Sequence, residues 1–300
     1  MLEGKVAIVT GAGRGIGRDI AIMMASYGAH VVVNDLGASG AGEGADVAPA
    51  EEVVSKIKAG GGEAIANFGN VAKREDAKLM FEQAMETFGA ADIVVNNAGI
   101  LRDAIFHRMT EDEWDAVISV HLQGAFNMAH AVATHFKEKA SGCFINFTST
   151  SGLIGNFGQA NYSAAKMGIV GLSKSLALDM ARFHVRSNCI APFAWSRLIG
   201  TIKADTDAEK ARVARIKEMT PAKIAPLCIA LAQPECTVTG QIFCVRNNEI
   251  FLMSQPRPLR SIHRSEGWTP ETVLDHALPA LEKDFYPLDR SSDIFTWDPV

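Results

Sequence analysis

The residues best suited to chemistry are a tyrosine and a lysine four positions apart, Tyr162 and Lys166. Residues with this spacing lie on one face of a helix, so both side chains can reach the same substrate. An ammonium group beside a phenol stabilises the phenolate and lowers its pKa from about 10 toward neutral pH. The tyrosine can then take or give a hydroxyl proton while a hydride moves. Alone, however, such a pair is most often two ordinary surface residues.

A serine supports the chemical interpretation of this pair. Ser149 lies thirteen residues before Tyr162, at the end of a β-branched run, where its hydroxyl could hydrogen-bond the same substrate oxygen. We therefore predict a Ser-Tyr-Lys site in which Tyr162 is the general base and Lys166 lowers its pKa. Ser149 is expected to hold the substrate oxygen.

A glycine-rich segment, Thr10 to Gly17, follows the first β-branched run and opens a helix-like segment. Glycines at this point permit a tight turn and let backbone N–H groups approach a pyrophosphate at the helix N-terminus. A glycine cluster alone is weak evidence, but its place between a strand and a helix makes it specific. The sequence therefore predicts a dinucleotide site that includes Gly11, Arg14, Gly15, Ile16 and Gly17.

The second expected strand ends at Asp35, eighteen residues after Gly17. A carboxylate at this place can accept hydrogen bonds from the adenosine ribose hydroxyls and repels a 2′-phosphate. Arg14 acts in the opposite direction, because a guanidinium could pair with that phosphate. Like-charge juxtaposition costs several kcal/mol, whereas an exposed arginine contact contributes about 1 kcal/mol. We therefore expect NAD rather than NADP.

The elements that must position these residues alternate along the chain. Seven short apolar runs read as strands, at 6–10, 30–35, 63–68, 92–96, 143–148, 185–190 and 241–245. Helix-period segments lie between them, near 16–28, 48–60, 73–89, 110–139, 161–182 and 207–232, with a break expected at Pro221. Apolar strands alternating with helices indicate an α/β fold with a doubly wound parallel sheet of about seven strands, of the Rossmann type.

The pattern changes after Val245. Residues 246–300 hold six of the eleven prolines and no strong strand pattern, so we expect a C-terminal extension rather than an independent domain. One helix is predicted there, with Thr269 as its N-cap and its end near Lys283. The stretch carries more large apolar side chains than it can bury against itself. We therefore expect it to pack on the domain formed by residues 1–245 or on a neighbouring subunit.

Composition excludes several classes of function. The net charge of −5 argues against nucleic acid as a partner, and no apolar run approaches the length of a membrane span. Five cysteines without close pairing predict neither a metal site nor a disulfide framework. The first strand pattern begins at Lys5 and residues 298–300 are not a peroxisomal address. These features lead us to expect a cytoplasmic protein without a targeting segment.

The motifs together resemble those of the short-chain dehydrogenase/reductase family. The resemblance rests on Thr10 to Gly17, Asn96-Asn97-Ala98-Gly99, Ser149, and Tyr162-Ser163-Ala164-Ala165-Lys166, in that order over roughly residues 4–245. It implies a single Rossmann-type domain, a nicotinamide cofactor, and assembly as a homodimer or homotetramer. It also implies that Asn70, Val71, Asn97, Gly99 and Pro192 contact the cofactor, together with Tyr162 and Lys166.

Four positions depart from the family pattern. His121 stands where the family has an asparagine as fourth catalytic residue, and Asn70 where it has an acidic residue near the adenine. Phe193 replaces the glycine after Pro192, and Arg246-Asn247-Asn248 replaces a glycine pair, which leaves the usual C-terminal turn in doubt. We expect His121 to support the proton relay through a ring nitrogen; the alternative is a purely structural histidine.

Some of these features indicate a subgroup. His121, Asn34 to Gly37, Asn97 to Asp103 and Asn156 to Tyr162 resemble the (3R)-hydroxyacyl-CoA dehydrogenase domain of multifunctional enzyme type 2. The resemblance implies NAD-dependent oxidation of a secondary alcohol on an acyl-CoA or steroid-like substrate. Two alternatives stay open at this point: an NADPH-dependent 3-oxoacyl or ketosteroid reductase, and a catalytically idle NAD-binding module.

Overall fold

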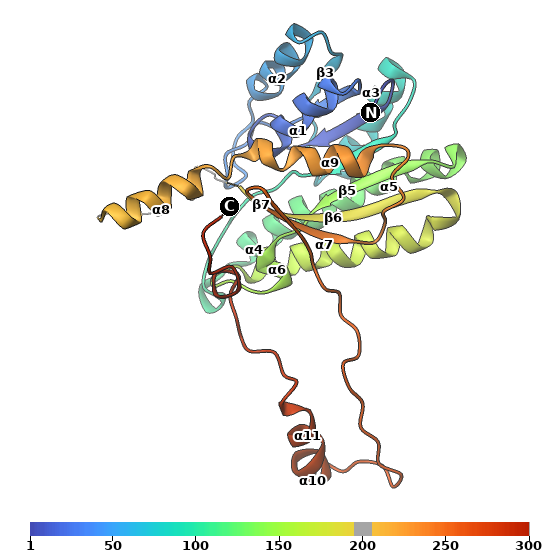
Figure 1. The fold of residues 1–300 in the computed structure, drawn as a ribbon. Coiled ribbons are helices and arrows are strands. Elements are labelled where there is room, and N and C mark those ends of the chain that lie inside the picture. Colours follow the sequence, from blue (N-terminus) through green and yellow to red (C-terminus); the bar gives the residue numbers. More distant parts are fainter. Residues whose placement is uncertain (195–205, 300) are drawn as a thin grey trace.

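The fold is built on one eight-stranded sheet. The computed structural model describes residues 1–194 and 206–299, and orders the strands β3-β2-β1-β4-β5-β6-β7-β8 (Figure 1). Neighbouring strands are parallel except β7 and β8, which are antiparallel. The strands are β1 (Val6–Thr10), β2 (His30–Asn34), β3 (Ala64–Asn67), β4 (Ile93–Asn96), β5 (Gly142–Phe147), β6 (Val185–Phe193), β7 (Ile242–Arg246) and β8 (Glu249–Leu252). The predicted doubly wound α/β fold is confirmed.

Helices cover both faces of the sheet. The longer ones are α1 (Gly15–Ser26), α2 (Ala48–Ala59), α3 (Arg74–Phe88), α4 (Glu111–Ile118), α5 (Gly124–Lys139), α7 (Ala160–Asp179), α8 (Asp207–Lys217) and α9 (Ala225–Ala232). The shorter ones are α6 (Thr150–Leu153), α10 (Pro270–Thr272), α11 (Leu278–Glu282) and α12 (Ser291–Ile294). As predicted, the 207–232 segment is broken near Pro221, where a 3₁₀ turn separates α8 from α9.

Side chains of the central strands belong alternately to two hydrophobic cores, one on each face of the sheet. Along β1, Ala7 and Val9 pack into the core under α1, α2 and α9, whereas Val6 and Ile8 pack into the core under α3 and α5. A strand covered on both faces must be apolar at every position, which is why these segments read as continuous apolar runs. β1 lies between β2 and β4, so the chain reverses its winding direction at the carboxyl end of β1, where such sheets bind ligands.

Two expectations about the elements were wrong in detail. The predicted helix 110–139 is divided by a π-helical turn, Ser119–Gln123, between α4 and α5. The expectation of no strand after Val245 is also wrong, because β8 pairs with β7 through a two-residue loop. Asn247 in that loop has a φ of 57°, a left-handed conformation that asparagine tolerates. The turn that replaces the glycine pair is therefore a hairpin.

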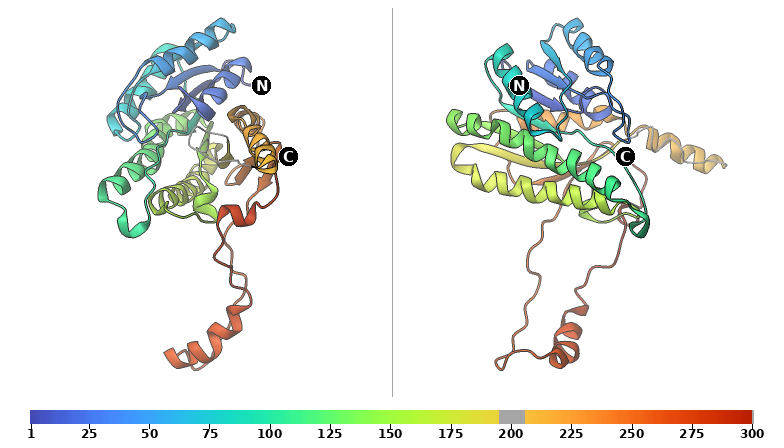
Figure 2. Two further views of the ribbon diagram at one scale, coloured as in Figure 1. Left: turned by 90° about the vertical axis from the view of Figure 1, so that its left-hand side faces the viewer. Right: turned by 180° about the vertical axis from the view of Figure 1, so that it is seen from behind.

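Residues 253–290, called the arm below, leave the body of the protein after β8. Two extended stretches run away from the sheet to α10 and α11, and the chain then returns to the body (Figures 1 and 2). Thr269 caps this distal helix through a capping box, as predicted, and helical structure continues to Glu282. β8 belongs to the main sheet, so residues 249–252 are not part of the arm. The boundary at residue 245 and the packing partner of the extension stay predictions.

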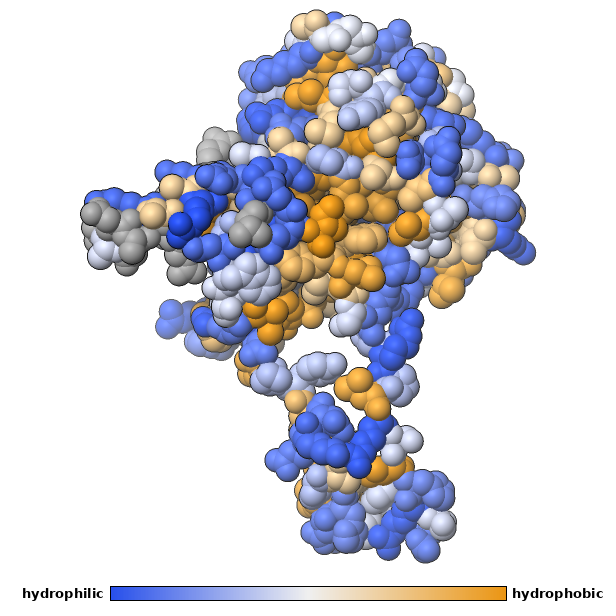
Figure 3. All heavy atoms as spheres, viewed as in Figure 1, coloured by the Kyte–Doolittle hydropathy of each residue, from blue (hydrophilic) through white to orange (hydrophobic). Residues whose placement is uncertain are grey.

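The surface is mixed in character. The face seen in Figure 3 carries apolar side chains near the centre of the body, while the arm alternates hydrophilic and apolar residues. Within residues 1–194 and 206–299, no helix is long and apolar enough to cross a membrane.

Candidate active site

The glycine loop between β1 and α1 is tightly packed. Gly11 has a φ of 63°, in the left-handed region that glycine adopts without strain. A Cβ on Gly17 would overlap the Gly11 carbonyl oxygen, so a larger residue does not fit. Asn97 holds the loop from the end of β4: its Nδ2 donates to the carbonyl oxygens of Thr10 and Gly11, both at 3.0 Å. The predicted cofactor residue Asn97 therefore shapes the loop.

The N-terminus of α1 is free to accept an anion. Its N-cap residue, Arg14, makes no side-chain capping hydrogen bond, and the first turn contains no acidic residue. The first N–H groups of a helix lack internal partners, and the helix dipole favours negative charge there. Gly15 lies in this turn with a φ of 55° and open space around it, and Ile16 follows. These residues fit the pyrophosphate of a dinucleotide.

Asp35 has a second role that the sequence did not reveal. Its Oδ2 accepts a hydrogen bond from the Gly13 N–H and its Oδ1 accepts one from the Gly37 N–H, both at 2.7 Å. The carboxylate therefore holds the glycine loop to the segment after β2. A carboxylate has about four acceptor positions, so two remain for ribose hydroxyl groups.

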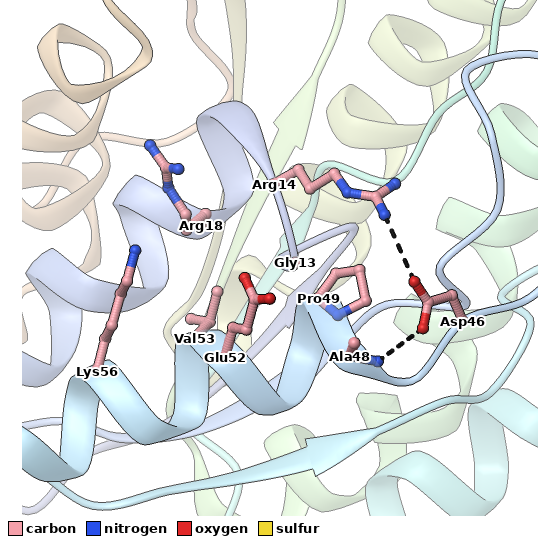
Figure 4. Close-up of a pocket in the computed structure, with 9 residues that line it drawn as sticks. All are labelled: Gly13, Arg14, Arg18, Asp46, Ala48, Pro49, Glu52, Val53 and Lys56. Carbon is pink, nitrogen blue, oxygen red and sulfur yellow. Dashed lines mark hydrogen bonds and ion pairs between the residues drawn. The ribbon is translucent and has the colours of Figure 1, made fainter.

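A cavity of about 170 Å³ lies beside the glycine loop, between α1 and α2 (Figure 4). At one end Arg14 points toward Asp46, with 3.9 Å between Nη2 and Oδ2, and Asp46 also accepts the Ala48 N–H. Arg18 and Lys56 line the other end, with Glu52 between the two ends. The cavity thus combines both signs of charge.

Asn70 and Val71, after β3, make hydrogen bonds within the protein, and their contact with the cofactor stays a prediction. The Asn70 side chain accepts the N–H of Ala72 at 3.0 Å, while the Asn70 N–H donates to Oδ2 of Asp76 at 2.8 Å. An acidic residue therefore lies at this turn, but six positions later in the sequence. Val71 is buried, and its carbonyl oxygen accepts Nδ2 of Asn127 at 2.8 Å. Both residues lie at the carboxyl end of β3.

Pro192 lies near the end of β6, where it pairs with Val245 of β7. The next residue, Phe193, packs against Phe295 of the C-terminal tail (residues 291–299), with ring centroids 5.0 Å apart. Phe295 also contacts Phe251 of β8, and Trp297 follows at 5.6 Å. Phe193, which stands where the family has a glycine, thus packs against aromatic residues near the C-terminus.

Ser149 and Tyr162 meet at the carboxyl end of β5. Ser149 is the N-cap of α6, and its Oγ accepts the Ser151 N–H at 3.1 Å. Tyr162 lies in the first turn of α7. Burial raises the pKa of Tyr162 above its usual value, and a hydrogen bond with the Ser149 side chain partly offsets this shift. The two hydroxyl groups therefore lie together, and the role of Ser149 in holding the substrate oxygen stays a prediction.

Lys166 is buried one turn further along α7. Its Nζ donates to the Phe147 carbonyl oxygen at 2.7 Å and lies 5.5 Å from the centre of the Tyr162 ring. Burial lowers the pKa of Lys166 from 10.5 to about 7. The pKa of Tyr162 is raised by its burial. The role of Lys166 in lowering the pKa of Tyr162 during catalysis stays a prediction.

His121 completes the set from the π-helical turn. Its Nε2 contacts the Ile100 carbonyl oxygen at 2.8 Å and the Ile100 N–H at 3.1 Å. Burial, and to a lesser degree the charge of Lys166, lowers the pKa of His121 to about 3, so the imidazole is neutral. A Cβ on Gly99 would overlap Cε1 of His121, which requires glycine at position 99. Gly99 thus makes room for the imidazole.

Sequence reasoning missed one residue at this site. Asn161 is fully buried directly before Tyr162, and its Nδ2 donates to the carbonyl oxygens of Arg102 and Glu113, both at 2.9 Å. Its Oδ1 accepts the Tyr162 N–H at 2.7 Å. Asn161 thereby fixes the start of α7 to two other segments. Asn161 belongs to the Asn156 to Tyr162 segment on which the subgroup resemblance rests, but its own role was not predicted.

The arrangement places a serine, a tyrosine and a lysine at the carboxyl ends of the strands, with the glycine loop at the same edge. This is a proton-transfer group next to a dinucleotide cradle. The sequence model of the short chain dehydrogenases matches residues 5–202. The chain belongs to this family of oxidoreductases. The Rossmann fold of the short-chain dehydrogenases binds a nicotinamide dinucleotide, and members of the family act on CH–OH groups.

Named relatives lie close in sequence and in fold. The chain is 40% identical to peroxisomal multifunctional enzyme type 2 of Mus musculus over 91% of its length, but spans only 36% of that protein. It is 37% identical to a hydroxyacyl-CoA dehydrogenase of Mycobacterium tuberculosis over 90% of its length and 86% of the relative. A short chain dehydrogenase from Mycobacterium avium superposes with a TM-score of 0.83 at 36% identity, covering 95% of this chain and 97% of the other. The similarity to multifunctional enzyme type 2 agrees with the sequence resemblance.

Proposed function

We propose that the chain is an NAD-dependent dehydrogenase that oxidises the secondary alcohol of a 3-hydroxyacyl-CoA or steroid-like substrate to a ketone. The observation that carries the proposal is the meeting of Ser149, Tyr162 and Lys166 at the strand edge that also holds the uncapped N-terminus of α1. An idle binding module would have no need of this buried lysine behind a tyrosine.

Each of the three side chains has a distinct task. The Ser149 hydroxyl binds the substrate oxygen and orients the carbinol group. Tyr162 then takes the hydroxyl proton as general base. Lys166 is held by a hydrogen bond to the Phe147 carbonyl oxygen. When its amine is protonated, its positive charge stabilises the Tyr162 phenolate. The bound dinucleotide supplies the hydride acceptor.

NAD is the proposed cofactor because acidic groups surround the place expected for the adenosine ribose. Asp35 lies at the glycine loop, and Asp46 pairs with the one arginine of that loop. A 2′-phosphate would therefore meet a carboxylate and compete for Arg14. Arg18 and Lys56, which line the adjacent cavity, favour the rival, an NADPH-dependent 3-oxoacyl or ketosteroid reductase.

The proposed substrate class follows from the relatives and from the lining of the site. One relative is named a hydroxyacyl-CoA dehydrogenase and matches over most of both chains. Phe157, eight residues after Ser149 in the sequence, is exposed to 73% and lies under the Arg290 guanidinium at 5.3 Å. Phe193 and Phe295 add apolar surface beyond Pro192. An acyl chain or ring system fits apolar walls of this kind.

We also propose that the enzyme is a homodimer or homotetramer in which the arm packs on a neighbouring copy. The arm exposes several large apolar side chains: Leu259, Trp268, Leu274, Leu278, Phe285, Tyr286 and Leu288. It extends away from its own body in every view (Figures 1 and 2). Apolar surface of this extent normally marks an interface. A second copy of the chain is the occupant that this family membership favours.

The deciding experiment follows absorbance at 340 nm with the purified full chain. Both enantiomers of 3-hydroxyacyl-CoAs of several chain lengths and a set of hydroxysteroids are offered with NAD or NADP, and the corresponding ketones with NADH or NADPH. Turnover of a hydroxyacyl-CoA with NAD supports the proposal. Turnover only of ketones with NADPH supports the reductase, and turnover of nothing, with dinucleotide still bound, supports the idle module.

A further inference from the structure

Two buried acceptors lie behind the catalytic residues without a partner. Oδ1 of Asn96 and Nδ1 of His121 are completely shielded from solvent, and neither has a hydrogen-bond partner among residues 1–194 and 206–299. The two side chains are only 6% and 4% exposed. A buried polar atom without a partner costs about 1–3 kcal/mol, so native proteins rarely leave two of them side by side.

The hydrogen bonds of His121 determine which of its nitrogens carries the proton. Nε2 lies 2.8 Å from the Ile100 carbonyl oxygen, closer than the 3.1 Å to the Ile100 nitrogen. A single nitrogen cannot both donate to the carbonyl and accept the N–H, and two lone pairs at 2.8 Å would repel. The shorter contact therefore favours Nε2 as the donor, and the ring then accepts nothing from the Ile100 N–H. Burial keeps the ring neutral. Nδ1 is then a bare acceptor and cannot donate to Asn96.

The orientation of the Asn96 amide is fixed from the other side. Its Nδ2 donates to Oδ1 of Asn146 at 2.9 Å, and Nδ2 of Asn146 in turn donates to Oγ of Ser187 at 3.1 Å. This chain of hydrogen bonds crosses β4, β5 and β6 and continues to Ser173 of α7 at 2.8 Å. With its nitrogen committed to Asn146, Asn96 presents its oxygen as a second acceptor.

Both residues line the same small cavity between the sheet and the π-helical turn. The full lining is Thr10, Val71, Asn96, Ala98, Val120, His121, Gly124, Ala125 and Ile169. Its volume is about 10 Å³ of space for the centre of a water molecule. Space for the centre of one water is therefore present, and a buried water also needs at least two polar partners, which Asn96 and His121 can supply.

We propose that a single buried water occupies this cavity and donates one hydrogen to Oδ1 of Asn96 and the other to Nδ1 of His121. A water molecule has two donors, and the cavity presents two unpaired acceptors. The water thereby holds His121 as the Nε2–H tautomer and ties it to the polar chain that begins at Asn96. Asn96 becomes a positioning residue, acting through the water and His121 on the ring that packs against Tyr162.

This water is separate from solvent in the substrate site. Its cavity is lined by residues of β1, β4, the π-helical turn and α5, and we assign this water no part in proton transfer. Its effect is to hold the imidazole in one tautomer and one place. The structural part of the proposal is independent of substrate; only its kinetic consequence rests on the proposed dehydrogenase function.

The first test uses the unaltered protein. A crystal structure of the NAD-bound enzyme at near-atomic resolution should show one water about 2.7–3.2 Å from both Oδ1 of Asn96 and Nδ1 of His121. Long-range ¹H–¹⁵N NMR of histidine-labelled protein should show His121 protonated at Nε2 alone. The His121 signals, assigned with His121→Asn, should not change between pH 6 and pH 9. An empty cavity, or a proton on Nδ1, overturns the proposal.

The second test compares two buried asparagines. Asn96→Leu removes the acceptor in the cavity at similar volume, whereas Asn127→Leu removes an equally buried amide that does not line the cavity. We expect mixed His121 tautomers and a fall in kcat of about tenfold, with KM little changed, only for Asn96→Leu. A tenfold fall corresponds to about 1.4 kcal/mol, the size of one net hydrogen bond. The same tautomer in both variants overturns the proposal. A changed tautomer in a protein without dehydrogenase activity would contradict the proposed function alone.

Discussion

The ring of His121 stands nearly perpendicular to that of Tyr162, at 88°, with centroids 5.2 Å apart. The imidazole is neutral and its Nε2 contacts the Ile100 backbone. The ring therefore packs against the Tyr162 phenol and does not act as a proton donor in this form. We expected a role in the relay through a ring nitrogen. The contacts favour a positioning role, and the relay role stays a prediction.

The first prediction compares two replacements of His121. An asparagine amide can accept the Ile100 N–H and donate to its carbonyl oxygen, as Nε2 contacts both atoms here. We therefore expect His121→Asn to keep kcat within about tenfold of the parent. His121→Leu fills similar space but leaves the Ile100 carbonyl oxygen without its donor, which should cost about 1–3 kcal/mol of stability and lower kcat further. Steady-state kinetics and urea unfolding measure both effects. Equal kinetics for the two variants would show that hydrogen bonding at this position is irrelevant.

Much of the site could be predicted because its motifs are local. The glycine loop is a continuous segment of eight residues, and Tyr162 and Lys166 are four residues apart on one helix, so each motif can be recognised from nearby residues alone. The parallel sheet was predictable because strands buried on both faces are apolar throughout. β8 was missed for the opposite reason: it lies at the sheet edge, and its burial alternates between half-buried and exposed residues.

The parts that sequence could not give depend on contacts between distant segments. The two hydrogen bonds of Asp35 join the loops after β1 and β2, and the acidic residue near Asn70 comes from α3. The burial of Lys166, which sets its pKa, is produced by the whole fold rather than by its neighbours in sequence. The site residues were recognisable from their types, but their protonation states were not.

The second prediction concerns the general base. Tyr162→Phe removes the phenol oxygen and should lower kcat by at least about 10²-fold, the lower range for a positioned acid–base group. Dinucleotide binding, measured by calorimetry, should survive, because Ser149 rather than the cofactor cradle contacts that oxygen. Tyr27→Phe is the matched control, since Tyr27 is 44% exposed at the end of α1. Near-normal turnover of Tyr162→Phe would mean that another group carries the proton.

The third prediction links Lys166 to stability. Its pKa is lowered from 10.5 in the unfolded chain to about 7 in the folded protein. Between these values the unfolded chain binds the proton that the folded protein has released, so stability rises with pH. Below pH 7 both states are protonated and the contribution is constant. Urea unfolding of the cofactor-free protein and of Lys166→Met should show a stability difference that shifts in favour of the parent as pH rises from 7 to 10. A difference that does not vary over this range would contradict the assigned burial of a charged group.

The fourth prediction tests the choice of cofactor. Because a carboxylate opposes a 2′-phosphate, kcat/KM should favour NAD over NADP by at least about tenfold, or about 1.4 kcal/mol. Asp35→Asn removes the charge and should lower this ratio. The variant also weakens the bonds to Gly13 and Gly37, so its absolute efficiency with NAD should fall too. The ratio of the two cofactors isolates the repulsion from this loss. A parent enzyme that uses both equally, or prefers NADP, would refute the assignment.

The arm and the returning tail have different partners. The tail is fixed to its own body: the Ser291 N–H donates to the Gly155 carbonyl oxygen at 3.0 Å, and the Trp297 indole donates to Glu249 at 2.9 Å. Among the described residues, the distal helix of the arm has no hydrogen bond of this kind to the body. Leu274 and Leu278 are 64% and 43% exposed on it. Truncating the whole extension would therefore remove both a support of the site and the proposed interface, and could not separate them.

The last prediction therefore changes only the arm. Leu274→Glu combined with Leu278→Glu places two charges on its apolar surface, and burying them against a neighbouring copy would be costly. We expect light scattering to report a smaller assembly for this variant. The melting temperature of its separated subunits should stay well defined, because these side chains are exposed within one subunit. Glu271→Gln, which changes an exposed residue at the start of the same helix, serves as the control and should keep the parent mass. If the double variant also kept the parent mass, the arm would not form the interface, and assembly would have to use the surface of the body.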